Sequence, residues 1–172
     1  MKKNDVSKAN HLIADHSMSS MKTNTSMYKN LLIMAIVSYV AMYALMYSMI
    51  DSLKNLVSNI NEIYMTLMMT ASMVIIELIV MHKMYTQKTW NIAILVISAI
   101  IGLLGFLGVR NQWGVGNMQF MKAMVPHHAA AILMAKEAKL TDPQLLVLRD
   151  SIVSSQSQEI EFMKAKIAEY EK

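Results

Sequence analysis

Three long apolar stretches dominate the hydrophobic pattern between residues 31 and 109. The first, residues 31–50, reads LLIMAIVSYVAMYALMYSMI and carries no charge. The second, residues 64–84, holds one carboxylate, Glu77, and the third, residues 90–109, reads WNIAILVISAIIGLLGFLGV. Twenty helical residues reach about 30 Å, which is the thickness of a bilayer's hydrocarbon core. The pattern therefore predicts three membrane-spanning helices, with the lipid bilayer as a partner.

Interfacial and small residues support the third predicted span. Aromatic and basic side chains flank it, as expected at a membrane surface: Trp90, Arg110 and Trp113. Glycines recur every three residues within it, which favours close packing of helices: Gly102, Gly105 and Gly108.

The residues after the spans, 110–172, have the pattern of a helical hairpin. Helices are expected over about 117–139 and 142–170, joined by the turn KLTDPQ. Thr141 with Gln144 fits a capping box, and Pro143 fits a first helical turn. Apolar positions share one face of the second helix: Leu145, Leu148, Ile152, Met163 and Ile167. Since two helices bury such faces poorly, we expect hairpins of two chains to pair into a four-helix bundle, making an all-α homodimer or higher oligomer.

The distribution of lysine and arginine predicts the orientation. Residues 1–30 form a polar arm with five lysines, too long and polar for an ordinary signal peptide. The first connection, 51–63, holds one lysine, and the second connection holds two. Because positive charge stays inside, we expect a flexible cytoplasmic arm and an external hairpin. The expected location is a bacterial inner membrane, with the hairpin in the periplasm.

Composition narrows the chemistry. The chain has 172 residues, 55% hydrophobic, with 19 Met, 5 His and no Cys. The absence of cysteine excludes disulfides, thiolate zinc sites and cysteine nucleophiles. The net charge of +4, without a basic cluster interleaved with aromatics, argues against nucleic acid as a partner. A soft-metal site in this chain must therefore use Met and His.

The stretch MKAMVPHHAAAILM, residues 121–134, supplies such residues on the first hairpin helix. On a helical wheel they share an arc of about 140°: Met121, Met124, His127, His128 and Met134. Pro126 is expected to point away from the arc and to kink the helix, so that the two imidazoles converge. On the facing helix, a polar pair beside Met163, Gln156 and Glu159, would accept from imidazole N–H groups.

Thioether and imidazole donors without thiolate or a carboxylate cluster suit Cu(I) and Ag(I) better than zinc, iron or magnesium. The alternative is packing, because Met fills helical cores readily. Packing is favoured for each Met taken singly, and metal binding for the two histidines with the Met stripe together.

The spans carry Met rows as well, and the sequence allows two interpretations of them. The residues concerned are Met42, Met46, Met69, Met73, Glu77 and Met81. In the favoured interpretation the Met side chains pack and Glu77 bonds to a hydroxyl such as that of Tyr43 or Tyr47. In the other, the thioethers form a path for Cu(I), with Glu77 as charge partner. The arm adds further soft donors on the other side: His11, His16, Met18, Met21 and Met27.

The hairpin resembles a known family. FMKAMVPHHAAAILMAKEA, DPQ and SIVSSQSQEIEFMKAKI, spanning about residues 117–168, are similar to the domain of unknown function 305. The shared elements are Phe120, Met124, Pro126-His127-His128, Met134-Ala135, Gln156, Glu159-Ile160 and Met163. Asn117 departs from the pattern, which often has Asp there. The resemblance implies a ferritin-like helical bundle with copper- or silver-binding members, and the front half resembles a membrane subgroup.

The expected function is therefore a membrane-anchored protein that binds Cu(I) or Ag(I) for buffering, delivery or resistance, exchanging metal with a partner protein. We do not expect an enzyme, since a di-iron centre needs Glu-x-x-His pairs that the sequence lacks. The alternative is an oligomeric membrane scaffold whose Met and His residues are core packing.

Overall fold

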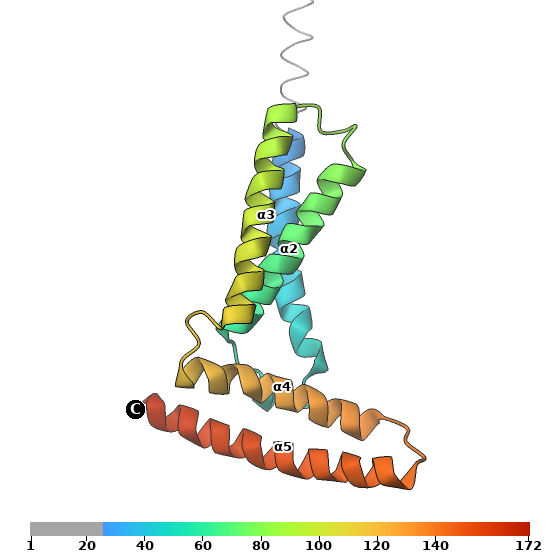
Figure 1. Ribbon diagram of the computed structural model, residues 1–172, viewed down its shortest axis with the longest axis vertical. Coiled ribbons are helices and arrows are strands. Elements are labelled where there is room, and N and C mark those ends of the chain that lie inside the picture. Colours follow the sequence, from blue (N-terminus) through green and yellow to red (C-terminus); the bar gives the residue numbers. More distant parts are fainter. Residues whose placement is uncertain (1–25) are drawn as a thin grey trace, which may run out of the picture.

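The computed structural model describes residues 26–172, and all regular structure in that range is helical (Figure 1). Three helices are long and apolar enough to cross a membrane: Ser26–Met49, α2 (Ile60–Val80) and α3 (Lys88–Asn111). They are followed by α4 (Asn117–Glu137) and α5 (Pro143–Tyr170). The predicted order, three spans and then a helical hairpin, is confirmed. Residues 1–25 of the predicted arm, with His11, His16, Met18 and Met21, lie outside the described residues.

The second helix differs from its predicted bounds. It begins four residues earlier, at Ile60, where the Asn59 side chain caps it by accepting from the Glu62 amide. It ends at Val80, and the chain then turns toward α3. The start was predicted too late because the first turn of this helix contains the polar residues Asn61 and Glu62, and a hydropathy pattern detects only the apolar middle of a span.

Glycines let α3 approach α2 closely, as their spacing predicted. A Cβ added at Gly105 would lie 2.8 Å from the backbone oxygen of Tyr64, and one at Gly108 would lie 2.9 Å from its ring. At Gly102 the added Cβ would meet only Ala71 Cβ, at an ordinary 3.5 Å. Two of the three glycines are therefore required by the packing distance.

Glu77 has a different partner from the one predicted. Its carboxylate interacts with Tyr85, a buried residue of the turn after α2; burial and this carboxylate raise the pKa of Tyr85. Tyr43 bonds to Ser58 and Tyr47, and Tyr47 bonds to Glu62. Glu77 therefore bonds to a hydroxyl as expected, but the named candidates Tyr43 and Tyr47 are wrong, because their hydroxyls lie at the opposite end of α2.

The hairpin lies across the end of the membrane helices, with α4 between them and α5 (Figure 1). Its core is formed by Met121, Val125, Ala129, Ile132, Ile160 and Met163. Ile50 and Val57, from the connection between the first two spans, pack against this core. Residues of the same chain thus cover part of the apolar hairpin face that was expected to pack against a second hairpin. Pairing of two chains into a four-helix bundle stays a prediction.

The turn between α4 and α5 is capped by a different residue from the predicted one. Asp142 is the N-cap of α5 and accepts from the Gln144 amide at 2.8 Å, while Pro143 occupies the first turn as predicted. The Thr141–Gln144 capping box is therefore wrong by one residue. The preceding helix, α4, ends at Glu137, two residues before the predicted end.

Candidate functional site

His128 is turned into the hairpin. It is buried, with Nδ1 2.9 Å from the Met124 carbonyl oxygen and Nε2 2.7 Å from Glu159 Oε2. The predicted contact between an imidazole and Glu159 is thus present. Each ring nitrogen thus lies within hydrogen-bond distance of an oxygen of the hairpin, so both nitrogens are engaged inside it.

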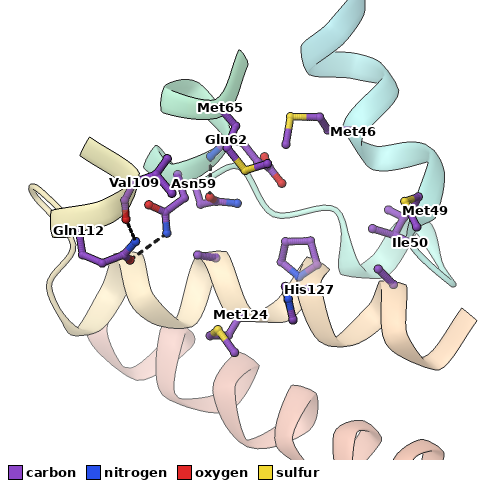
Figure 2. Close-up of a pocket in the computed structure, with 14 residues that line it drawn as sticks. Met46, Met49, Ile50, Asn59, Glu62, Met65, Val109, Gln112, Met124 and His127 are labelled. Atoms are coloured by element: carbon purple, nitrogen blue, oxygen red, sulfur yellow. Dashed lines mark hydrogen bonds between the residues drawn. The ribbon is translucent and has the colours of Figure 1, made fainter. Parts of the chain in front are cut away.

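His127 points the other way. Its ring rises from α4 toward the end of the N-terminal helix, near Met46 and Met49 (Figure 2). The two imidazole centroids are 6.2 Å apart with planes inclined at 61°, and the rings face different neighbours. The predicted convergence of the histidines is wrong, because adjacent helical residues project about 100° apart and α4 continues through Pro126.

Pro126 does not point away from the ligand face as predicted. It is buried and lines the same cavity as His127 and Met124. Its missing amide hydrogen leaves the Lys122 carbonyl without its helical partner.

The other predicted hairpin residues do not gather around the histidines. Met121 and Met163 are buried in the hairpin core, and Met134 is exposed near the end of α4. Gln156 Oε1 is buried without a hydrogen-bond partner among the described residues. Asn117, in the first turn of α4, donates to the Tyr170 hydroxyl at 3.3 Å.

A cavity of about 310 Å³ lies between α4 and the ends of the membrane helices (Figure 2). Its potential donors come from three helices, the N-terminal helix, α2 and α4: Met46, Met49, Glu62, Met65, Met124 and His127. Of the predicted residues, it brings together His127 and Met124 of the hairpin with Met46 of the first span. In Figure 2 the Met124 thioether is turned toward α5, whereas Met46, Glu62 and Met65 lie across the cavity from the His127 ring.

Glu62 is the carboxylate of this cavity and is held in place by its neighbours. It is buried, and Tyr47 donates a hydrogen bond to its Oε2. Its amide donates to Asn59 Oδ1 at 3.1 Å, which fixes the start of α2. A carboxyl group is thereby held where the spans meet the hairpin.

Sequence reasoning did not group Met49, Glu62 and Met65 with His127. Met49 lies at the end of the first span, and Glu62 and Met65 lie near the start of the second. The connection between these two spans was not considered as part of a site. The available signal was the return of Met and Glu immediately beside that connection, on helices that must lie side by side.

The donor set of the cavity is soft. Thioethers and one imidazole predominate, with one carboxylate nearby. Within residues 26–172, His, Asp and Glu side chains do not gather in groups of three or more that could hold a metal ion.

Comparison with known proteins places the chain in a family. The model of the domain of unknown function DUF305 matches residues 115–167, which include all of α4 and most of α5. The chain is also 31% identical over 144 residues to Uncharacterized protein L153 of Acanthamoeba polyphaga mimivirus, covering 81% of this chain and 91% of that protein. The chain belongs to the DUF305 family.

The two matches of this DUF305 protein differ in extent. The family model covers the hairpin alone, whereas the 144 residues aligned with the viral protein necessarily extend into the membrane helices. That protein's name states no activity. No solved structure matches the chain.

Proposed function

We propose that this DUF305 protein is a membrane-anchored protein that binds Cu(I) or Ag(I) in the cavity between its spans and its hairpin. The observation that carries the proposal is a cavity lined by Met46, Met49 and Met65, the His127 imidazole and the Glu62 carboxylate. His127, Met46 and Met65 are the assigned ligands, with Met49 and Met124 beside them.

The donor chemistry supports a soft monovalent ion. Thioethers bind Cu(I) and Ag(I), imidazole also binds them, and neither donor set favours magnesium or calcium. His127 makes no hydrogen bond within residues 26–172, in contrast to His128, so its ring nitrogens remain open to a ligand. The thioethers are neutral, and the Glu62 carboxylate would offset the charge of a bound cation near the membrane.

The two adjacent histidines provide a matched test. Cu(I) is titrated into the full chain in detergent against a competing chelator, with the His127→Ala and His128→Ala variants in parallel. We expect at least a tenfold weaker affinity for His127→Ala and wild-type affinity for His128→Ala. Circular dichroism checks that both variants keep their helices. Equal affinities for wild type and His127→Ala, or no tight binding by either, would refute the proposed site.

A binding site at the end of the spans fits buffering, delivery or resistance, with metal passed to a partner protein. The positive-inside distribution supports an orientation with the hairpin outside and residue 26 toward the cytoplasm, as in a bacterial inner membrane. Because the chain has no cysteine, an Asp150→Cys variant gives a single label on the hairpin. Labelling of intact cells by an impermeant maleimide is expected, and labelling only after lysis would reverse the orientation.

The second candidate is an oligomeric scaffold, and exposed apolar side chains on α5 favour it. They are Leu145, Val147, Leu148 and Phe162. Pairing with a second hairpin would cover such residues. A monomeric mass in detergent, measured by light scattering across a range of protein concentrations, would count against this role.

A further inference from the structure

Thioethers continue from the cavity into the membrane along the seam between the N-terminal helix and α2. Thr66 Oγ1 donates to Met46 Sδ at 3.4 Å, and Thr70 Oγ1 approaches Met42 Sδ at 3.9 Å. Both pairs advance by four residues in opposite directions. The two helices are therefore antiparallel in this register, with both methionine side chains turned toward α2.

Thioethers are also present at the far end of the same seam. A cluster of Leu31, Val74, Leu78 and Tyr85 joins the N-terminal helix to α2 there. The methionines packed against this cluster are Met27, Met34, Met73 and Met81. The seam thus has thioethers at the cavity end, in the middle and at the opposite end of the spans.

The spacing along the seam is nearly regular. The hydrogen-bonded register sets Met46 and Met42 level with residues 66 and 70 of α2, and its extension sets Met34 level with 78. Met73 falls between these levels, so successive thioethers from Met46 to Met34 are three to five residues apart along α2. At about 1.5 Å per residue this is about 4.5–7.5 Å along the helix axis. Glu77 lies in the widest interval.

We propose that this seam transfers Cu(I) between the junction cavity and the opposite end of the membrane domain. The inference rests on the proposed function, since the cavity is where the ion enters or leaves. In each step a bond from copper to one thioether sulfur breaks as a bond to the next forms. The ion remains Cu(I), so no electron and no proton is exchanged. Glu62 at one end and Glu77 farther along supply negative charge in an otherwise apolar route.

Ordinary packing makes a different prediction from transfer. Leucine and methionine have similar volumes, so a Met→Leu change in a packed seam costs little stability. Leucine has no sulfur, so the same change removes a copper ligand. Replacing Met73 opens an interval of eight residues, from the level of Met42 to that of Met34, or about 12 Å. That interval is too long for a cation to pass directly from one thioether to the next.

The test uses the full chain in liposomes, with the Met73→Leu variant and Met68→Leu as control. Met68 is on the same helix but faces α3, where its Cβ lies near Gly105. Cu(I) is supplied outside as a weak chelator complex with a reductant, and a Cu(I)-binding dye inside reports transfer. Equilibrium binding is measured on the same three proteins in detergent.

We expect wild type and Met68→Leu to transfer copper, and Met73→Leu to bind with unchanged affinity but transfer at least tenfold more slowly. Transfer by Met73→Leu at the wild-type rate, or a wild type that binds without transfer, would overturn the seam and leave the proposed binding function standing. Transfer by a wild type whose affinity is unaffected by His127→Ala would overturn the proposed site and retain the seam. Neither binding nor transfer in the wild type would overturn both.

Discussion

Gly105→Ala tests whether the approach of α3 to α2 positions the cavity residues. The added Cβ would lie 2.8 Å from Tyr64 O, about 0.6 Å closer than the 3.4 Å at which ordinary contact begins. The obstacle is a backbone oxygen, so relief requires the helices to separate. Overpacking of this kind costs about 1–3 kcal/mol. Alanine regains about 1 kcal/mol of helix propensity, so the expected net loss is about 0–2 kcal/mol.

Gly102→Ala is the matched control on the same helix. Its Cβ would meet Ala71 Cβ at 3.5 Å, so only the propensity gain remains, about 0–1 kcal/mol of stabilisation. The free energy of unfolding is measured in mixed detergent micelles by titrating with sodium dodecyl sulfate and following helicity. A Gly105→Ala protein as stable as Gly102→Ala would refute the argument.

The same pair of variants reports on function. The α2 helix carries Glu62 and Met65, and Tyr64 lies between them in sequence. Displacing α2 from α3 at Tyr64 moves both cavity residues, so Gly105→Ala should also weaken Cu(I) binding severalfold. Gly102→Ala should leave the affinity unchanged, and a weaker affinity for Gly102→Ala alone would contradict this link.

Three further predictions concern residues outside the cavity. Asp142→Ala removes the observed cap of α5 and should cost about 1 kcal/mol in the same unfolding assay, whereas Thr141→Ala should be nearly neutral; the reverse order would restore the capping box. His128→Ala should lower the free energy of unfolding by about 1–3 kcal/mol, because it removes a buried ring with two hydrogen-bond partners. Glu159→Gln keeps an acceptor and should cost less, and equal losses for the two variants would contradict this ranking. Because the pKa of Tyr85 is raised in the folded protein, its contribution to stability is complete below the unfolded value of about 10 and is lost as pH rises through the folded pKa. Tyr85→Phe should therefore reduce the alkaline loss of helicity, and an unchanged alkaline transition would exclude this contribution.

Of the candidate site, the sequence supplied the kinds of donor but only part of their grouping. Helical spacing placed Met124 and His127 on one arc of the first hairpin helix, and Met46 was recognised as part of a Met row. Met49, Glu62 and Met65 could not be assigned to the site from the sequence. They lie on the first two predicted spans, and only the packing of α4 against the ends of these helices brings the hairpin to them. A helical wheel gives neighbours within one helix and says nothing of which face meets which other element.

The sequence by itself determined the three spans, the hairpin and a glycine face on the third span that permits close packing. These follow from local quantities: apolar length matched to bilayer thickness, turn residues, and glycines whose missing side chains permit contact. Only the tertiary structure decided that His128 faces Glu159 while His127 faces the membrane helices, and that Glu77 interacts with Tyr85. Adjacent helical residues point about 100° apart, so packing of α4 between α5 and the spans separates the two imidazoles, and the helix register decides which hydroxyl reaches which carboxylate.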